Sequence, residues 1–102
     1  MSRAAVREAS DGVLELSGVL DYLSGPDLRK KGGALIKASK SAALVVDCSA
    51  VTKSSSVGVS LLLAFMRDAQ AVGKPFTVRE LPHDMQKIAG VSGLLEILPQ
   101  PA

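Results

Sequence analysis

Three consecutive serines, Ser54, Ser55 and Ser56, are the residues whose type and spacing point most clearly to chemistry. They stand between an apolar, β-branched stretch and a long apolar segment with helical spacing. Their hydroxyls are therefore expected to meet the unpaired N–H groups and the positive dipole end of a helix. Capping that helix needs only one serine. Because a helix N-terminus accommodates phosphate, the run indicates a kinase target or an anion-binding turn, with simple capping as the alternative.

Other residue types that perform catalysis are few and isolated along the chain. Cys48 ends an apolar stretch and is interpreted as a small buried hydrophobe, with a reactive thiol as the alternative. Asp47 lacks a partner base in the sequence, and His83 is expected on the surface. The sequence contains neither the phosphate-binding loop Gly-x-x-x-x-Gly-Lys-Ser/Thr nor the glycine spacing of a dinucleotide-binding loop. The sequence therefore predicts no catalytic residues, and a hydrolase or transferase using Ser56 or Cys48 as nucleophile would lack a nearby base.

The composition excludes several classes of protein. One cysteine and one histidine among 102 residues exclude a disulfide framework or a zinc site built within the chain, so no metal and no cofactor is expected. Aromatic residues make up 3% of the chain, which is too few for recognition of single-stranded nucleic acid. With 47% hydrophobic and 22% charged residues, the chain is predicted to fold as a single domain over residues 1–102.

The net charge of +2 hides an uneven distribution. Residues 29–67 hold seven basic residues and one acid, which leaves +6 there and −4 elsewhere. A solvated helix face is the commoner explanation, and a field that faces a partner is the alternative. The sequence shows no apolar leader and no apolar run long enough to span a bilayer, so a cytoplasmic location is expected.

The elements that position the serines follow from periodicity and turn signals. Asp11–Gly12 between two short stretches predicts an antiparallel hairpin, Ser24 is expected to cap a helix, and Gly32–Gly33 in that helix predicts a kink or close packing. The expected strands are 4–9, 13–17, 43–48 and 76–80, the expected helices are 26–39, 57–72 and 82–90, and 94–98 forms a short final element. Residues 53–56 are expected to form a turn.

This order of elements predicts an α/β fold. A mixed sheet of four to five strands begins with the antiparallel hairpin, and the helices lie mainly on one face. The helix over 57–72 is apolar over more than the single stripe that a surface helix needs. Either it is buried on both sides, or part of it docks on another protein.

Four segments together resemble the STAS domain family, named after sulphate transporters and anti-sigma factor antagonists. They are Leu16–Asp21 after the second strand, Leu44–Val51 along the apolar strand, Ser55–Leu63 at the start of the second long helix, and Ala89–Leu98 at the end. The resemblance covers nearly the whole chain and implies a STAS-like fold. In the anti-sigma factor antagonists of this family, a partner kinase phosphorylates the serine after a motif aspartate. Ser56 falls at that acceptor position, while Ser55 replaces the aspartate, so Ser56 is either a phosphoacceptor or only a contact residue.

Within the family, the chain is similar to the small STAS subunits of Mla-type bacterial phospholipid transporters. That similarity implies a non-catalytic cytoplasmic accessory subunit, peripheral to the inner membrane, which binds an MlaF-like ABC ATPase. The ATPase in turn belongs to a complex with permease and substrate-binding subunits that maintains outer-membrane lipid asymmetry, and the subunit itself would bind neither lipid nor nucleic acid. The alternative is a phosphorylation-regulated anti-sigma factor antagonist whose partner is a kinase.

Partner binding is predicted at the serine turn and the adjoining helix, as a small apolar patch with a polar rim. The predicted contact residues are Lys53, Ser54, Ser55, Ser56, Val57, Val59 and Ser60.

Overall fold

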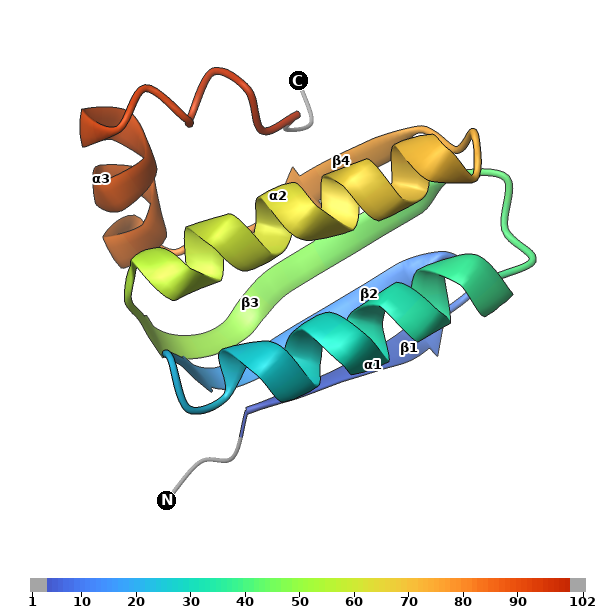
Figure 1. Cartoon of the computed structure of the whole chain (residues 1–102), viewed down its shortest axis with the longest axis horizontal. Helices are drawn as coiled ribbons and strands as arrows, with labels where there is room; N and C mark the ends of the chain where they lie inside the picture. Colours follow the sequence, from blue (N-terminus) through green and yellow to red (C-terminus); the bar gives the residue numbers. More distant parts are fainter. Residues whose placement is uncertain (1–3, 100–102) are drawn as a thin grey trace.

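A computed structural model describes residues 4–99 of the chain (Figure 1). Seven helices and strands follow one another within these residues. They are β1 (Ala5–Ser10), β2 (Val13–Leu20), α1 (Gly25–Ala38), β3 (Leu44–Ser54), α2 (Ser56–Ala71), β4 (Phe76–Arg79) and α3 (His83–Val91).

The strands form one four-stranded sheet in the order β1-β2-β3-β4. β1 and β2 pair antiparallel, whereas β2–β3 and β3–β4 pair parallel. The parallel pairs are connected by α1 and α2, which lie together on one face of the sheet (Figure 1). This arrangement confirms the predicted mixed sheet with its initial hairpin and helices mainly on one face.

The stretch 94–98 forms turns and not a fifth strand, so the sheet has four strands within residues 4–99. Leu98 from this stretch is buried in the core. The following residue, Pro99, accepts a hydrogen bond from the Val78 N–H at 2.8 Å on its carbonyl. The C-terminal stretch therefore covers part of the outer edge of β4, an edge that pairs with no other strand of the described residues.

The predicted hairpin turn forms at Asp11–Gly12, where Gly12 has a φ of 77° that favours glycine. Glu8 stabilises this turn, because its carboxylate accepts hydrogen bonds from the Gly12 N–H at 3.0 Å and the Ser39 hydroxyl at 2.9 Å. These two bonds, with the charge of Lys74, lower the pKa of Glu8. The hairpin is thereby tied to the chain just after α1.

The core lies between the sheet and the two long helices. Its largest fully buried side chain is Phe65 of α2. The other large side chains below 2% exposure are Leu14, Leu16, Leu20, Leu28, Ile36, Leu44, Leu62, Met85, Val46, Val59 and Val78.

The opposite face of the sheet carries a row of four charged residues in register across all four strands: Arg7, Glu15, Asp47 and Arg79. Arg7 donates to Glu15 at 3.2 Å, and Arg79 donates to Asp47 at 3.0 Å. Burial opposes ionisation of Asp47, but hydrogen bonds from Ser49 and Arg79 outweigh it and lower the pKa of Asp47. The row therefore neutralises its own charge.

β2 and β3 extend further than the sequence predicts, to Leu20 and Ser54. The register between them shifts twice. Past Cys48 the buried positions of β3 come three apart, at Val51 and Ser54, and not at alternate positions. This change conceals the strand from a search for period-two alternation. Lys53 and Ser54 consequently belong to the strand, and their assignment to a turn was wrong.

Two features at α1 refine the prediction. Ser24 occupies the N-cap position but makes no capping bond, because its hydroxyl donates to the Val19 carbonyl at 3.0 Å and accepts from the Asp21 N–H at 3.1 Å. Gly32 and Gly33 serve close packing: a Cβ at Gly32 would overlap the Phe65 ring. α1 therefore approaches α2 more closely than any larger residue at this position would allow.

The apolar surplus of α2 is explained by packing within the chain. The helix contacts the sheet as well as α1 and α3. Leu63 and Met66, which lie beside its buried stripe, are half-buried against the core. Of the two alternatives for this helix, burial on more than one side accounts for most of its apolar residues.

Candidate functional site

The three serines have different environments at the junction of β3 and α2. Ser54, at 8% exposure, donates from its hydroxyl to the Ser55 carbonyl at 2.8 Å. Ser55 is the N-cap, and its hydroxyl accepts from the Val57 N–H at 3.2 Å. The Ser55 backbone N–H also donates to the Leu20 carbonyl at 2.9 Å, which ties the start of α2 to the end of β2.

Ser56 differs from the other two serines in that its hydroxyl is free within residues 4–99. It is the first residue of α2, its side chain is exposed, and its hydroxyl makes no hydrogen bond to any residue between 4 and 99. Because Ser55 already caps the helix, capping does not require Ser56. A free hydroxyl at a helix N-terminus can donate to a partner or accept a phosphoryl group.

Close packing beneath the junction fixes the position of Ser56. Gly58 is buried, and a Cβ there would overlap the Ser54 hydroxyl oxygen and lie 3.1 Å from both Leu20 Cδ1 and Met85 Cε. This third residue of α2 is therefore held against β2, β3 and α3 at once. Only glycine allows this approach.

The remaining predicted contact residues divide into surface and core. Lys53 and Ser60 are exposed, and Val57 is half-buried. Val59 is 1% exposed and lies in the core, so its assignment to the contact surface was wrong. Buried Ser54 likewise supports the surface from beneath. Nearness in sequence to the serines does not place Val59 on their surface, because a helix turns successive residues to different sides.

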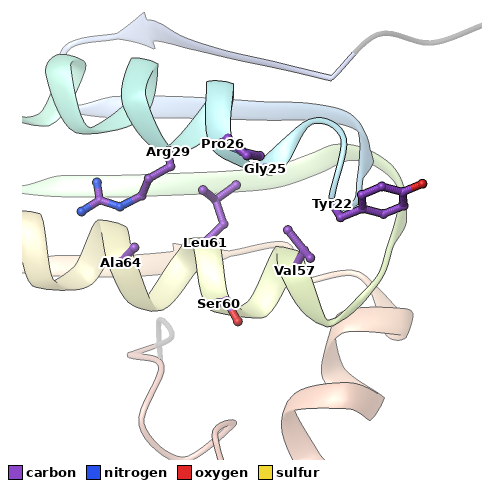
Figure 2. Close-up of a pocket in the computed structure, with 8 residues that line it drawn as sticks. All are labelled: Tyr22, Gly25, Pro26, Arg29, Val57, Ser60, Leu61 and Ala64. Atoms are coloured by element: carbon purple, nitrogen blue, oxygen red, sulfur yellow. The ribbon is translucent and has the colours of Figure 1, made fainter.

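A groove beside this junction was missed by the sequence analysis. It has a volume of about 370 Å³ and lies between the N-terminal parts of α1 and α2 (Figure 2). Its lining residues are Tyr22, Gly25, Pro26, Arg29, Val57, Ser60, Leu61 and Ala64. Two large apolar residues in the loop before α1, Tyr22 and Leu23, are 76% and 74% exposed. The sequence signal for this groove is the adjacent apolar pair Tyr22 and Leu23, which lies in a segment predicted only to connect a strand to a helix.

The candidate catalytic residues are not assembled into a site. Cys48 is fully buried in the core, Asp47 lies on the opposite face of the sheet, and His83 is exposed at the start of α3. Among residues 4–99, no three histidine, cysteine, aspartate or glutamate side chains gather where they could hold a metal ion. None of the helices described in that range is long and apolar enough to cross a membrane.

Cys48 is expected to be unreactive in the folded protein. Burial, together with the charge of Asp47, raises the pKa of the thiol to about 12. At pH 8 a thiol-specific chromogenic disulfide should therefore label Cys48 about a thousandfold more slowly than it labels free cysteine. In denaturant, one equivalent should be labelled at the ordinary rate. Fast labelling of the folded protein would show that Cys48 is accessible.

Known proteins share the fold of this chain. A family model described as "Mlab, STAS domain" matches residues 4–99. The chain belongs to the STAS domain family. The family model that matches describes the MlaB type of STAS domain. In fold, the chain is similar to a chain of the Acinetobacter MlaFEDB complex in its ATP-bound conformation, with a TM-score of 0.78. That match has 22% identity and covers 95% of this chain and 99% of the other.

Other STAS structures are also similar. An anti-sigma factor antagonist from Mycobacterium paratuberculosis is 28% identical with a TM-score of 0.76, covering 96% of this chain and 83% of that one. The anti-sigma factor antagonist SpoIIAA in its unphosphorylated form is 19% identical with a TM-score of 0.72, covering 98% and 89%. Among curated proteins, the comparison finds no significant match.

Proposed function

We propose that this STAS domain is a non-catalytic accessory subunit that binds the MlaF-like ATPase of an Mla-type ABC transporter and supports phospholipid transport. In this role it acts in the cytoplasm at the inner membrane and helps maintain outer-membrane lipid asymmetry. The observation that carries the proposal is the exposed Ser56 at the start of α2, whose hydroxyl has no hydrogen-bond partner within residues 4–99, in a domain whose fold matches a chain of the MlaFEDB complex.

The surface around Ser56 suits recognition by another protein. Ser55 and Gly58 hold the start of α2 in place, so a partner meets a preorganised polar group and loses little conformational entropy in ordering it. A standard interface buries about 800 Å² on each side, which would extend beyond Ser56 to Lys53, Ser60 and the groove. One hydrogen bond from Ser56 would contribute about 1 kcal/mol.

Substitution of Ser56 tests the proposal directly. A buried, unpaired charge costs several kcal/mol, so Ser56→Arg and Ser56→Glu are expected to abolish co-purification with the tagged ATPase. Ser56→Ala, which loses only one hydrogen bond, should weaken binding by about tenfold or less. Ser10→Arg, at the exposed end of β1, serves as the control and should bind normally. Normal binding of Ser56→Arg in a correctly folded protein would contradict this surface.

A phosphorylation-regulated anti-sigma factor antagonist is the second candidate. The 28% identity to the Mycobacterium paratuberculosis antagonist favours it, as does the accessible Ser56 hydroxyl. Incubation with the cognate kinase and ATP, followed by intact mass measurement, separates the candidates. One phosphate per chain, absent in Ser56→Ala, would support the antagonist, and an unchanged mass together with ATPase binding would support the transporter subunit.

A further inference from the structure

We propose that the face where α1 and α2 lie side by side binds an acidic segment of the ATPase that carries a protruding apolar side chain. The inference rests on the function proposed above. Two adjoining grooves lie along this face and share Pro26 and Arg29 in their linings. The first begins beside the N-terminus of α2, and the second continues along α1. Together they form the α1–α2 face.

The first groove is an apolar recess without net charge. Leu61, which is 4% exposed, and Val57 point toward α1 (Figure 2). Gly25 leaves the recess open, since a Cβ there would lie 2.7 Å from a Val57 methyl carbon. Arg29, the one charged residue in the lining, is neutralised by a bidentate ion pair with Asp68. The complement of such a recess is an aliphatic or aromatic side chain.

The second groove has a volume of about 510 Å³ and is cationic. Lys30 and Lys37 line it, seven residues apart on α1, which places them about 10 Å apart along the helix axis. Neither forms an ion pair with another residue of the described range 4–99. With Arg29 occupied by Asp68, Lys30 and Lys37 remain as cations that no acid of the described range compensates. Their complement is a pair of carboxylates.

A segment of the ATPase fits this face better than a membrane or a second copy. Val57 and Ser60 line the apolar groove and lie within the first turns of α2, so a partner that covers Ser56 also covers the mouth of the groove. A membrane surface is matched by protruding apolar side chains. Tyr22 and Leu23 protrude beside this groove, but the groove itself reaches down to Leu61, which is 4% exposed, and so suits a side chain that protrudes from a protein.

Charge reversal of both lysines tests the cationic half. Lys30→Glu/Lys37→Glu is expected to weaken ATPase binding about thirtyfold at 50 mM NaCl and to flatten the dependence of the Kd on salt, because its attraction to the acidic segment is lost. Lys40→Glu/Lys87→Glu is the matched control, since both lysines are exposed, lie outside both grooves, form no ion pair within residues 4–99 and change the net charge equally. The control should change the Kd by less than about threefold. Equal effects of the two pairs would overturn the proposal.

Filling the recess tests the apolar half. Ala64→Met places a long side chain in the first groove and should weaken binding about tenfold with an unchanged salt dependence. Ala71→Met, at the exposed end of the same helix, should bind like the wild type. Circular dichroism and thermal unfolding verify that each variant is folded. Wild-type affinity of Ala64→Met would overturn the proposal.

The failures of the two proposals are distinguishable. If Ser56→Arg abolishes binding while the groove variants bind like their controls, the ATPase uses the α2 terminus and not this face. If the wild type does not bind the ATPase at all, both proposals fall. Sedimentation of the wild type, but not of Lys30→Glu/Lys37→Glu, with phosphatidylglycerol-containing vesicles would assign the face to anionic lipid. A salt-sensitive dimer lost in the same variant would assign it to self-association, and either result would overturn the inference.

Discussion

Replacing Phe65 by alanine is expected to lower the free energy of unfolding by about 3–5 kcal/mol. The ring is completely buried between α1 and α2 and is the largest buried side chain of the core. Its loss removes apolar contacts and leaves a cavity that rigid neighbours fill only in part. Urea unfolding followed by circular dichroism measures the change, and a loss below about 1 kcal/mol would mean that the site collapses onto the space.

Gly32 offers a partner for a double-mutant cycle with Phe65. In the wild type, Gly32→Ala should destabilise by about 1–2 kcal/mol, because the new methyl group meets the Phe65 ring and outweighs the better helix propensity of alanine. In the Phe65→Ala background the same change should be neutral or stabilising. Additive effects of the two substitutions would show that this contact does not set the spacing of α1 and α2.

Gly58→Ala is expected to destabilise the protein by about 1–3 kcal/mol. The new methyl group would displace the Ser54 hydroxyl, break its bond to the Ser55 carbonyl and press on Leu20 and Met85. The matched control is Gly90→Ala in α3, where a Cβ meets nothing within 4 Å. There the higher helix propensity of alanine should stabilise by up to about 1 kcal/mol.

The effect of a glycine-to-alanine substitution on the free energy of unfolding should thus have opposite signs at these two helical positions. The midpoint temperatures of thermal unfolding of the two variants, each compared with the wild type, measure these effects. A stabilised Gly58→Ala variant would mean that the junction of β3 and α2 relaxes easily, and the preorganisation of Ser56 would lose its structural basis.

Much of the fold could be predicted because local signals agreed with it. Asp11–Gly12 marked the hairpin, and the apolar spacing of 57–72 marked α2. The far half of β3 could not be found, because two register shifts against β2 break its alternation. These shifts depend on pairing with another strand, so nothing within the segment itself reveals them.

The candidate site was located by sequence but not resolved by it. Three adjacent serines identified the start of α2, yet only tertiary packing buries Ser54, assigns the cap to Ser55 and leaves Ser56 exposed. The groove could not be predicted from the sequence either, because tertiary packing forms it. It forms only where Gly25 and Gly32 let α1 approach α2, and this approach joins residues about thirty positions apart along the chain.

The hydrogen bond from Val78 to Pro99 has a consequence for the solubility of the isolated domain. An uncovered edge strand offers its free backbone groups to other chains and promotes aggregation. Because the chain after α3 occupies part of the β4 edge, less of that edge is open to pairing with another chain, although no further strand is added to the sheet. The residues between α3 and Pro99 therefore protect the β4 edge from pairing with the edge strand of another molecule. A variant that lacks them is expected to be less soluble.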